Sequence, residues 1–454
     1  MKIIIVGAGE VGFHIASRLA LENKDVVVID TDSEALRRVS ESLDVHVVNG
    51  SGSSPVVLDE AGIKTAEILL AVTNSDEANL VACLVADIVS PATKKLARIR
   101  NAGYDGYHDH FKEFSPHIDM VINPEIEVVK TIERLIKVPG SVDVEVFAGG
   151  RLQFISMRID EGSKLDGVKL LDMPVLAGGV APLVAAVVRN DRMIVPSGRD
   201  QLMAGDLVYF ISAVDDLTGV LALFGKEATS TKRAFIVGGG RIGERLARAL
   251  EDKSIHTKII EKDQDRCREL ADKMNKAVVL NGDGSDQSLL QEENIQDVDV
   301  LITLTNDEET NILVSLLGKR MGAKNTITKI TKFSYFPLMA TIGLEQVVSP
   351  RLSAIDTILQ HVRKGRVLSA ISVHGEQAEV IEAVALETSD IVGKPVRKIA
   401  FPKGALLIGI VRDDEVVVPS GDSVIQPDDK VVIFAMRQVV PKIEKMLTVK
   451  LEFF

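Results

Sequence analysis

One glycine pattern occurs twice in this chain, each time directly after a run of apolar residues. Positions 4–12 read IIVGAGEVG and positions 235–243 read FIVGGGRIG, so Gly7 and Gly238 stand 231 positions apart. The first glycine of a Gly-x-Gly-x-x-Gly pattern permits a sharp strand-to-helix turn, the second lets the backbone approach a pyrophosphate, and the third lets the helix pack closely on the strand. The chain is therefore predicted to contain the same strand-turn-helix unit twice.

The repeat extends well beyond the glycines. Further landmarks recur at nearly the same spacing: Asp30 as Glu261, positions 49–52 (NGSG) as 281–284 (NGDG), and Thr73-Asn74 as Thr305-Asn306. A period of about half the chain is too long for a solenoid repeat. It indicates a duplicated pair of domains.

Each copy changes character partway along. In the first, a helical pattern from Val11 to Leu21 and an apolar run from Val26 to Ile29 begin an alternation of strands and helices that continues to about Val121. Such alternation predicts a parallel sheet covered by helices. Beyond Pro139-Gly140, short β-branched runs punctuated by Gly, Pro and Asp predict a small strand-rich domain. Asn190-Asp191 and Asp413-Asp414 are predicted hairpin turns.

The predicted fold class is α/β, with two Rossmann-like parallel-sheet domains, each followed by a small α+β domain. The predicted boundaries are 1–123 for the first Rossmann-like domain, 124–138 for a crossover helix, 139–225 for the first strand-rich domain, 232–349 for the second Rossmann-like domain, 350–365 for a second crossover helix and 366–454 for the second strand-rich domain. Positions 225–232 are the expected linker between the copies.

A carboxylate follows each glycine turn at the same distance. Asp30 and Glu261 each stand 18 positions after the last glycine, where the second strand should end and where a carboxylate can accept from ribose hydroxyls. This favours NAD or an adenine nucleotide over NADP. The alternative is that these are glycine turns in a fold that binds no nucleotide.

Polar residues follow the predicted fourth strand of each copy. Thr73-Asn74 and Thr305-Asn306 follow apolar runs, and ligands bind at the carboxyl ends of strands in open α/β sheets. They are expected to contact ribose or the distal half of a ligand, unless they simply cap the following helices.

The two copies differ in charge around the expected phosphates. Glu10 in the first turn is Arg241 in the second, so the second site should tolerate a more negatively charged polyphosphate. Conversely, Arg98 and Arg100 become Lys329 and Thr331. Two non-equivalent sites are predicted, unless Glu10 and Arg241 both point to solvent.

No catalytic or metal-binding set stands out. His108, His110 and His117 fall in a polar region with unfavourable spacing for a shared metal, and Cys83 and Cys267 have no partner motif. With a formal charge of -12, no Trp and four Tyr, the chain lacks the character of a nucleic-acid-binding protein. The longest apolar region, 173–188, is interrupted by Gly and Pro and cannot span a bilayer as one helix.

Over its whole length the chain resembles the TrkA family, the cytosolic NAD-binding regulatory subunits of bacterial Trk potassium-uptake systems. The resemblance rests on the two glycine turns with Asp30 and Glu261, on Arg98-Ile99-Arg100-Asn101, on Asn123-Pro124-Glu125, on the Val-Pro-Ser-Gly hairpins at 195–198 and 418–421, and on the duplicated domain order. It implies two RCK (KTN) domains, each with a TrkA-C lobe.

The resemblance also implies a function and ligands. It implies NAD or NADH as cofactor, or ATP or ADP, above all in the second copy; a homo-oligomeric ring; and a cytoplasmic location on the inner face of the cell membrane beneath a TrkH/TrkG-like potassium transporter whose gate the ring controls. The full set of residues predicted to bind nucleotide is Gly7, Ala8, Gly9, Glu10, Val11, Gly12, Asp30, Ser51, Thr73, Asn74, Arg98 and Arg100 in the first copy, and Gly238, Gly239, Gly240, Arg241, Ile242, Gly243, Glu261, Asp283, Thr305, Asn306 and Lys329 in the second.

Some relatives place a cation at the Glu of Asn-Pro-Glu, whereas the second copy here reads Ser349-Pro350-Arg351. Because an arginine in the first turn of a helix opposes the helix dipole, an ion pair between Glu125 and Arg351 is a reasonable hypothesis. The predicted function is a nucleotide-sensing regulatory subunit rather than an enzyme. The alternatives are an NAD-dependent dehydrogenase with duplicated cofactor domains and a soluble metabolite-binding scaffold.

Overall fold

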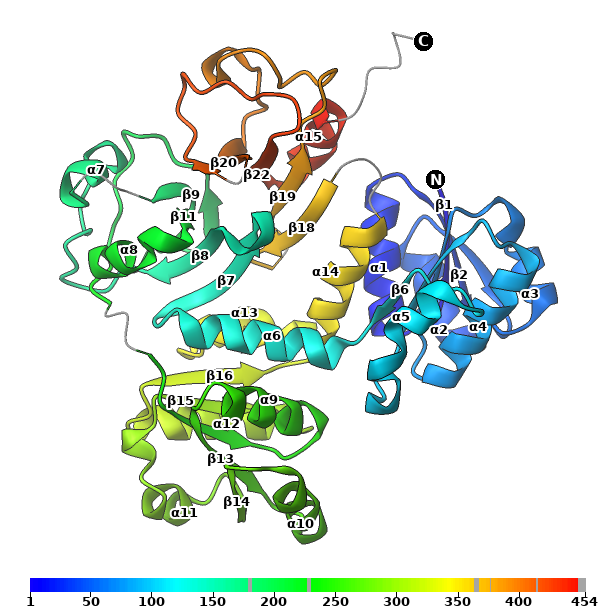
Figure 1. Ribbon diagram of the computed structural model, residues 1–454, viewed down its shortest axis with the longest axis horizontal. Coiled ribbons are helices and arrows are strands. Elements are labelled where there is room, and N and C mark those ends of the chain that lie inside the picture. The colour runs from blue at the N-terminus through cyan, green and yellow to red at the C-terminus, as the bar shows by residue number, and fades with distance from the viewer. Residues whose placement is uncertain (179–181, 227–229, 363–366, 376, 414, 448–454) are drawn as a thin grey trace. The chain divides into compact units, whose positions relative to one another are not determined.

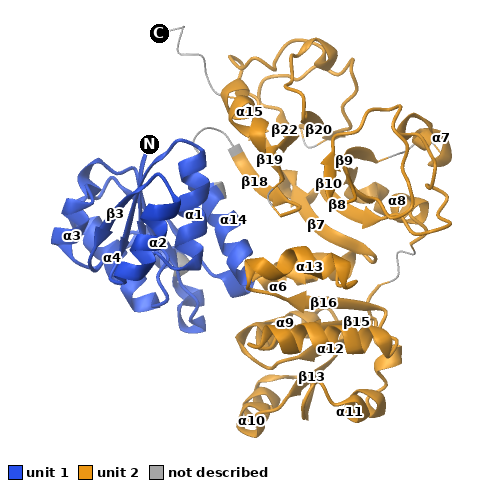
Figure 2. Ribbon diagram, turned by 180° about the vertical axis from the view of Figure 1, so that it is seen from behind, with its two compact units in different colours: residues 1–127, 350–363 blue, residues 128–349, 364–454 orange. Residues whose placement is uncertain are grey.

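The structure of the chain is a computed structural model that describes residues 1–454 apart from 179–181, 227–229, 363–366, 376, 414 and 448–454 (Figure 1). The described chain divides into two compact units, one formed by residues 1–127 with 350–363 and the other by residues 128–349 with 364–454 (Figure 2). The central residues of the expected linker, 227–229, lie outside the described part of the chain.

The first unit is built on a six-stranded parallel sheet with the order β3-β2-β1-β4-β5-β6. Its strands are β1 (Lys2–Val6), β2 (Asp25–Asp30), β3 (His46–Asn49), β4 (Ile68–Ala71), β5 (Lys94–Arg98) and β6 (Met120–Ile122). The connecting helices are α1 (Glu10–Leu21), α2 (Ser33–Ser42), α3 (Pro55–Glu60), α4 (Asp76–Val89) and α5 (His108–Glu113). Strands covered on both faces must be apolar throughout, which explains the unbroken apolar runs of β1 and β4.

The second unit contains a sheet of the same order, β14-β13-β12-β15-β16-β17, and all its strand pairs are parallel. Its strands are β12 (Arg233–Val237), β13 (His256–Glu261), β14 (Val278–Asn281), β15 (Val300–Thr303), β16 (Asn325–Lys329) and β17 (Gln346–Val348). Its helices are α9 (Arg241–Asp252), α10 (Gln264–Lys273), α11 (Gln287–Glu292), α12 (Glu308–Arg320) and α13 (Phe336–Thr341). In both sheets the order reverses beside the glycine strand, which is the crevice where such folds bind ligands. The predicted Rossmann-like class is confirmed for both copies.

The strand-rich domains are five-stranded antiparallel sheets of the second unit, ordered β10-β9-β11-β8-β7 and β18-β19-β22-β20-β21. The first consists of β7 (Ser141–Phe147), β8 (Leu152–Arg158), β9 (Leu183–Arg189), β10 (Arg192–Ile194) and β11 (Leu207–Ala213), with α7 (Met173–Leu176) and α8 (Leu217–Leu223). The second consists of β18 (Val367–Val373), β19 (Ala378–Val384), β20 (Ala405–Arg412), β21 (Glu415–Val417) and β22 (Lys430–Met436), with α15 (Val440–Leu447).

The two antiparallel sheets share one apolar core. Phe154 stacks on Tyr209 at a ring-centroid distance of 5.6 Å and on Phe434 of the other sheet at 6.4 Å. Asn190 and Asp191 have φ values of 50° and 59°, as the predicted hairpin between β9 and β10 requires. In the second predicted hairpin Asp413 has a φ of 45°, and residue 414 lies outside the described residues.

The crossover helices are exchanged between the two halves. From Val128 onward, α6 (Pro124–Lys137) shares the core of the second parallel-sheet lobe, and Glu133 forms an ion pair with Lys253, the residue that follows α9. α14 (Pro350–Val362), which follows the second sheet in the chain, belongs to the first unit and lies against α1 (Figure 2). The first lobe is thus completed by residues from the second half of the sequence.

Among the residues that the structure describes, no helix is long and apolar enough to cross a membrane.

Candidate nucleotide-binding site

The three glycines of the first turn have three different steric roles. Gly7 has a φ of 115°, a conformation that side chains rarely adopt. A Cβ atom on Gly12 would lie 1.8 Å from the carbonyl oxygen of Gly7, whereas a Cβ on Gly9 would meet nothing within 4 Å. The second turn repeats this arrangement at Gly238, Gly243 and Gly240. The middle glycine therefore leaves open the space that a phosphate group needs.

Both turns lead into helix N-termini that lack a side-chain cap. Gly9 is the N-cap of α1 and Gly240 is the N-cap of α9, and neither has a side chain that could accept from the first-turn N–H groups. These N–H groups and the positive end of the helix dipole form an anion-binding position. Phosphate is the expected occupant.

The acids at the ends of β2 and β13 hold the turns in place. The Asp30 carboxylate accepts from the backbone N–H of Ala8 at 2.5 Å and of Asp32 at 2.9 Å. Glu261 accepts from Gly239 N–H at 2.7 Å and from Asp263 N–H at 2.9 Å. Because each carboxylate oxygen has two lone pairs, the same groups can also accept from a ribose hydroxyl.

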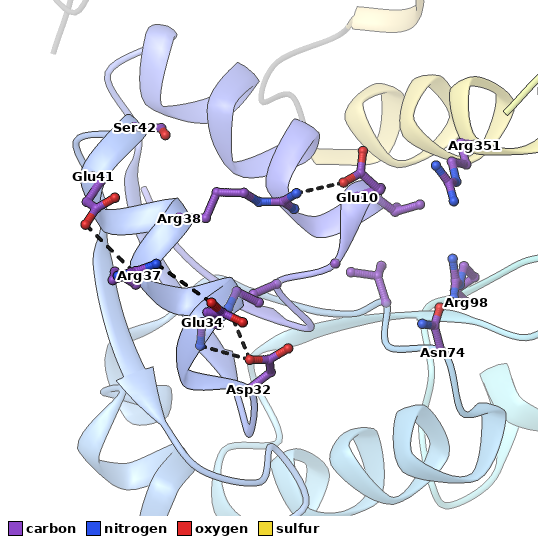
Figure 3. A pocket seen from close by; sticks show the side chains of 15 residues that line it. Glu10, Asp32, Glu34, Arg37, Arg38, Glu41, Ser42, Asn74, Arg98 and Arg351 are labelled. Carbon is purple, nitrogen blue, oxygen red and sulfur yellow. Dashed lines mark hydrogen bonds and ion pairs between the residues drawn. The ribbon is translucent and has the colours of Figure 1, made fainter. Parts of the chain in front are cut away.

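A cavity of about 680 Å³ opens beside the first turn, which is within the size range of small-molecule sites (Figure 3). The predicted residues that line it are Ala8, Gly9, Glu10, Val11, Asn74 and Arg98. The other predicted residues of this copy do not line it: Gly7, Gly12, Asp30, Ser51, Thr73 and Arg100. The lining residues that sequence reasoning missed are Asp32, Glu34, Ala35, Arg37, Arg38, Glu41, Ser42, Val72 and Arg351.

One end of this cavity is strongly cationic. Arg98, at the end of β5, is buried and donates to the Thr73 carbonyl at 2.7 Å and to Asn74 Oδ1 at 2.9 Å. Burial, together with the nearby charges of Arg100 and Arg351, lowers the pKa of Arg98 to about 10. Within the described part of the chain, its buried Nε has no hydrogen-bond partner. This end of the cavity is therefore complementary in charge to an anion.

Arg351 reaches the cavity from α14, and Figure 3 shows it facing Arg98. Sequence reasoning connected Arg351 only with Glu125, which is buried at the start of α6. That ion pair stays a hypothesis. No sequence signal links Arg351 to the first glycine turn, because the link depends on the exchange of the crossover helices.

The opposite end of the cavity is bounded by α2. Asp32 caps this helix by accepting from Glu34 N–H and Ala35 N–H at 2.9 and 3.2 Å. Arg38 pairs with Glu10 at 2.9 Å, and its guanidinium carbon lies 4.8 Å from the centre of the Phe13 ring. Glu10 therefore has a defined partner at the cavity rim, and its effect on nucleotide preference stays a prediction.

The polar ends of β4 and β15 are held by buried asparagines that sequence reasoning missed. Asn79 Oδ1 accepts from Thr73 N–H at 2.9 Å, and its amide donates to the Arg98 carbonyl at 2.8 Å. Asn311 joins Thr305 N–H to the Lys329 carbonyl in the same way, at 2.9 and 3.1 Å. An asparagine stands at this position in both copies, and that recurrence is the sequence signal that could have identified these two residues.

Thr73, Asn74 and their counterparts do not cap the following helices. The caps are Ser75, which accepts from Ala78 N–H, and Asp307, which accepts from Thr310 N–H. The alternative interpretation of Thr73-Asn74 and Thr305-Asn306 as helix caps is therefore wrong.

The predicted residues of the second lobe are distributed differently. Arg241 is exposed, whereas Lys329 is buried with its Nζ 3.4 Å from the Leu304 carbonyl. Asp283, like Ser51 in the first copy, lies in an exposed loop, and its carboxylate accepts from Ser285 N–H at 2.8 Å. Gly284 and Gly52 bring these loops against the glycine strands, since a Cβ there would lie 2.2 Å from Val237 and Val6.

Metal clusters and cysteines are the other reactive groups to consider, and Cys267 Sγ lies 3.2 Å from the Glu261 carbonyl oxygen. Within the described residues, no group of three or more His, Cys, Asp and Glu side chains could share a metal ion. Cys83 and Cys267 are buried free thiols, and burial raises the pKa of Cys83 to about 12.

Comparison with known proteins identifies the domains. The TrkA-N domain matches residues 3–124 and 234–350, and the TrkA-C domain matches residues 154–225 and 380–448. The chain is 38% identical over 458 residues to the Trk system potassium uptake protein TrkA of Halomonas elongata, with 100% of each chain covered. It is 36% identical over 452 residues to the TrkA homolog 1 of Methanosarcina mazei, covering 98% of this chain and 99% of the homolog.

Solved structures share the fold. The GsuK channel superposes with a TM-score of 0.60 at 17% identity, covering 98% of this chain and 78% of that chain, and the GsuK channel bound to NAD gives a TM-score of 0.59 with the same identity and coverage. The full-length sequence identity, the two TrkA-N domains and the two TrkA-C domains together place the chain in the TrkA family of Trk system potassium uptake proteins.

Proposed function

We propose that this chain is a nucleotide-sensing regulatory subunit that gates a membrane potassium-uptake protein. The observation that carries the proposal is the cavity beside the first glycine turn. It brings an uncapped helix N-terminus together with a cluster of arginines, and the Asp30 carboxylate holds the adjoining turn in place. Membership of the TrkA family speaks against the dehydrogenase alternative and supports a role in transport.

The ligand that this site fits is NAD or NADH, or an adenine nucleotide such as ADP or ATP. Asp30 and Glu261 favour a free 2′-hydroxyl over a 2′-phosphate, because a second anion beside a carboxylate is repelled. Structures described as GsuK bound to NAD and GsuK bound to ADP have the same fold. The arginines at the far end supply charge for a terminal phosphate.

The proposed mechanism is a shift between conformations of a homo-oligomeric ring on the cytoplasmic face of the membrane. A nucleotide that binds one arrangement of the lobes more tightly than another favours that arrangement. At a concentration of one hundred times its dissociation constant, a ligand contributes about 2.7 kcal/mol to the state it binds. No covalent step is needed.

Thermal unfolding of the full chain tests ligand binding. NAD, NADH, ATP and ADP are titrated separately into the wild type, Asp30→Ala and Glu261→Ala, and a concentration-dependent rise of Tm is expected in the wild type. Loss of part of that rise in each variant supports two sites. The absence of any shift with all four nucleotides would sink the proposal.

Reconstitution tests the partner. Vesicles that contain a TrkH/TrkG-like potassium transporter should retain the chain, and potassium flux should change when nucleotide is added. Vesicles without the transporter are the control. Equal retention by both vesicles would favour a soluble scaffold.

A further inference from the structure

The two parallel-sheet lobes differ at one position of the helix that follows the acid. The third residue of α2 is Ala35, which lines the first cavity, and the third residue of α10 is Arg266. The two lobes have the same strand order, glycine turn and acid, so Ala35 and Arg266 occupy equivalent positions. The side chain of Arg266 therefore extends into the region that is open beside the turn of the first lobe.

Arg266 is fixed on the turn itself. Its Nε donates to the carbonyl oxygen of Gly239 at 2.8 Å, while its other nitrogens bond Glu244 of α9 at 2.7 Å and Glu269 of α10 at 2.8 Å. Lys273 adds a second cation to Glu244 at 3.1 Å. The guanidinium thus joins the glycine turn and the two helices around it.

The packing beneath Arg266 is also tighter than in the first lobe. A Cβ on Gly239 would lie 2.4 Å from Leu270 Cδ1, whereas the equivalent residue of the first turn is Ala8, which carries a methyl group. The glycine lets Leu270 approach the turn. α10 therefore closes on the second turn at the place where α2 leaves room.

The first lobe uses its arginine differently. Arg38 stands one turn further along α2 and pairs with Glu10 at the cavity rim (Figure 3). Ala35 therefore lines an open cavity. Both lobes have a charged link between their first two helices, and among the hydrogen bonds of the described residues only the link of the second lobe includes a bond to the turn carbonyl.

We propose that Arg266 sets the nucleotide response of the second lobe by occupying the base-and-ribose end of its cleft. This inference rests on the proposed nucleotide binding. A nucleotide must displace the guanidinium from Gly239 before its adenosine half can settle against the Glu261 carboxylate. The second lobe therefore binds adenine nucleotides more weakly than its glycine turn alone would allow, and the first lobe responds at lower concentration.

Hydrogen exchange of the full chain during an ADP titration gives a readout for each lobe. Peptides covering 2–15 report the first turn, and peptides covering 233–246 report the second. In Arg266→Ala, ADP should protect the second turn at about tenfold lower concentration than in the wild type, which corresponds to ~1.4 kcal/mol. Arg268→Ala is the matched control, because Arg268 lies on the same helix and pairs only with Asp265 among the contacts described for it. That variant should behave as the wild type.

An equal or higher ADP requirement in Arg266→Ala would overturn the inference. If that variant does not fold, Ala35→Arg decides in its place: a weaker ADP response of the first turn supports the inference, and an unchanged response overturns it. The proposed function fails separately, by absence of protection of either turn with NAD, ADP or ATP in the wild type.

Discussion

Arg98 and Arg351 line the same cavity although they come from different halves of the chain, and the charge of Arg351 contributes to the lowered pKa of Arg98. Two like charges held close together repel each other. The arrangement is stable because β5 and α14 belong to the folded frame of the lobe. It gives this end of the cavity a specific requirement for an anion.

Arg351→Ala is expected to weaken binding of ADP and ATP to the first lobe by about tenfold or more, because a hydrogen bond to a charged group contributes about 1.5–3 kcal/mol. Calorimetric titration measures this effect. Lys64→Ala is the control, since Lys64 is an exposed residue of this lobe that pairs with Asp59. Unchanged binding in Arg351→Ala would exclude Arg351 from the site.

Gly9→Ala and Gly12→Ala are expected to fail in different ways. A Cβ at Gly12 would overlap the Gly7 carbonyl, and its accommodation should cost about 1–3 kcal/mol or prevent folding. A Cβ at Gly9 meets no protein atom within 4 Å, and the residue has an extended φ of -65°, so the stability cost should be about 1 kcal/mol or less. Gly9→Ala should nevertheless lose nucleotide binding, because the methyl group occupies the phosphate position. A Gly9→Ala variant that binds ADP normally contradicts this view of the turn.

The repeating parts of the site could be predicted from the sequence. The two glycine turns and the acids at the ends of β2 and β13 follow from local spacing, because a tight turn requires glycine and the acid stands at a fixed distance from it. Strand alternation then fixed the parallel class. Thr73 was placed correctly at the end of its strand, although its partner Asn79 was missed.

The parts that depend on tertiary neighbours could not be predicted. Arg351 reaches the first cavity only because the crossover helices are exchanged, and the sequence alone does not indicate against which sheet a connecting helix packs. Arg38 and Arg266 look alike in the sequence as charged residues on exposed helices. Arg38 pairs with Glu10 at the cavity rim, whereas Arg266 bonds the carbonyl oxygen of Gly239. This difference depends on which turn of the helix faces the glycine turn.

Asp30→Asn and Glu261→Gln should each lower the free energy of unfolding by about 1 kcal/mol, because an amide oxygen replaces only one of the two acceptors that hold the turn. Asp30→Asn should also remove the ADP response of the first turn while leaving that of the second. Urea unfolding and lobe-resolved hydrogen exchange measure these effects. Loss of both responses in either variant would show that the two sites are not independent.

Asp143, on β7, provides a test of pH dependence in the strand-rich part of the chain. Its carboxylate accepts from Tyr209 OH at 3.1 Å and from Ser156 Oγ at 3.2 Å. Desolvation by the surrounding protein raises the pKa of Asp143 despite these bonds and the nearby His374, and Glu345 adds to the rise. The folded state therefore holds a proton that the unfolded chain releases near pH 3.9. As the pH rises from about 4 through the raised pKa of the folded state, deprotonation of Asp143 should lower the free energy of unfolding. Above that pKa the loss should stay constant.

Asp143→Asn keeps the shape of the side chain but does not titrate. The free energy of unfolding of the wild type minus that of the variant should therefore become more negative across this pH window. Asp215→Asn, at an exposed position, is the control. Urea unfolding between pH 4 and 8 measures both, and a flat difference for Asp143→Asn would contradict the assignment.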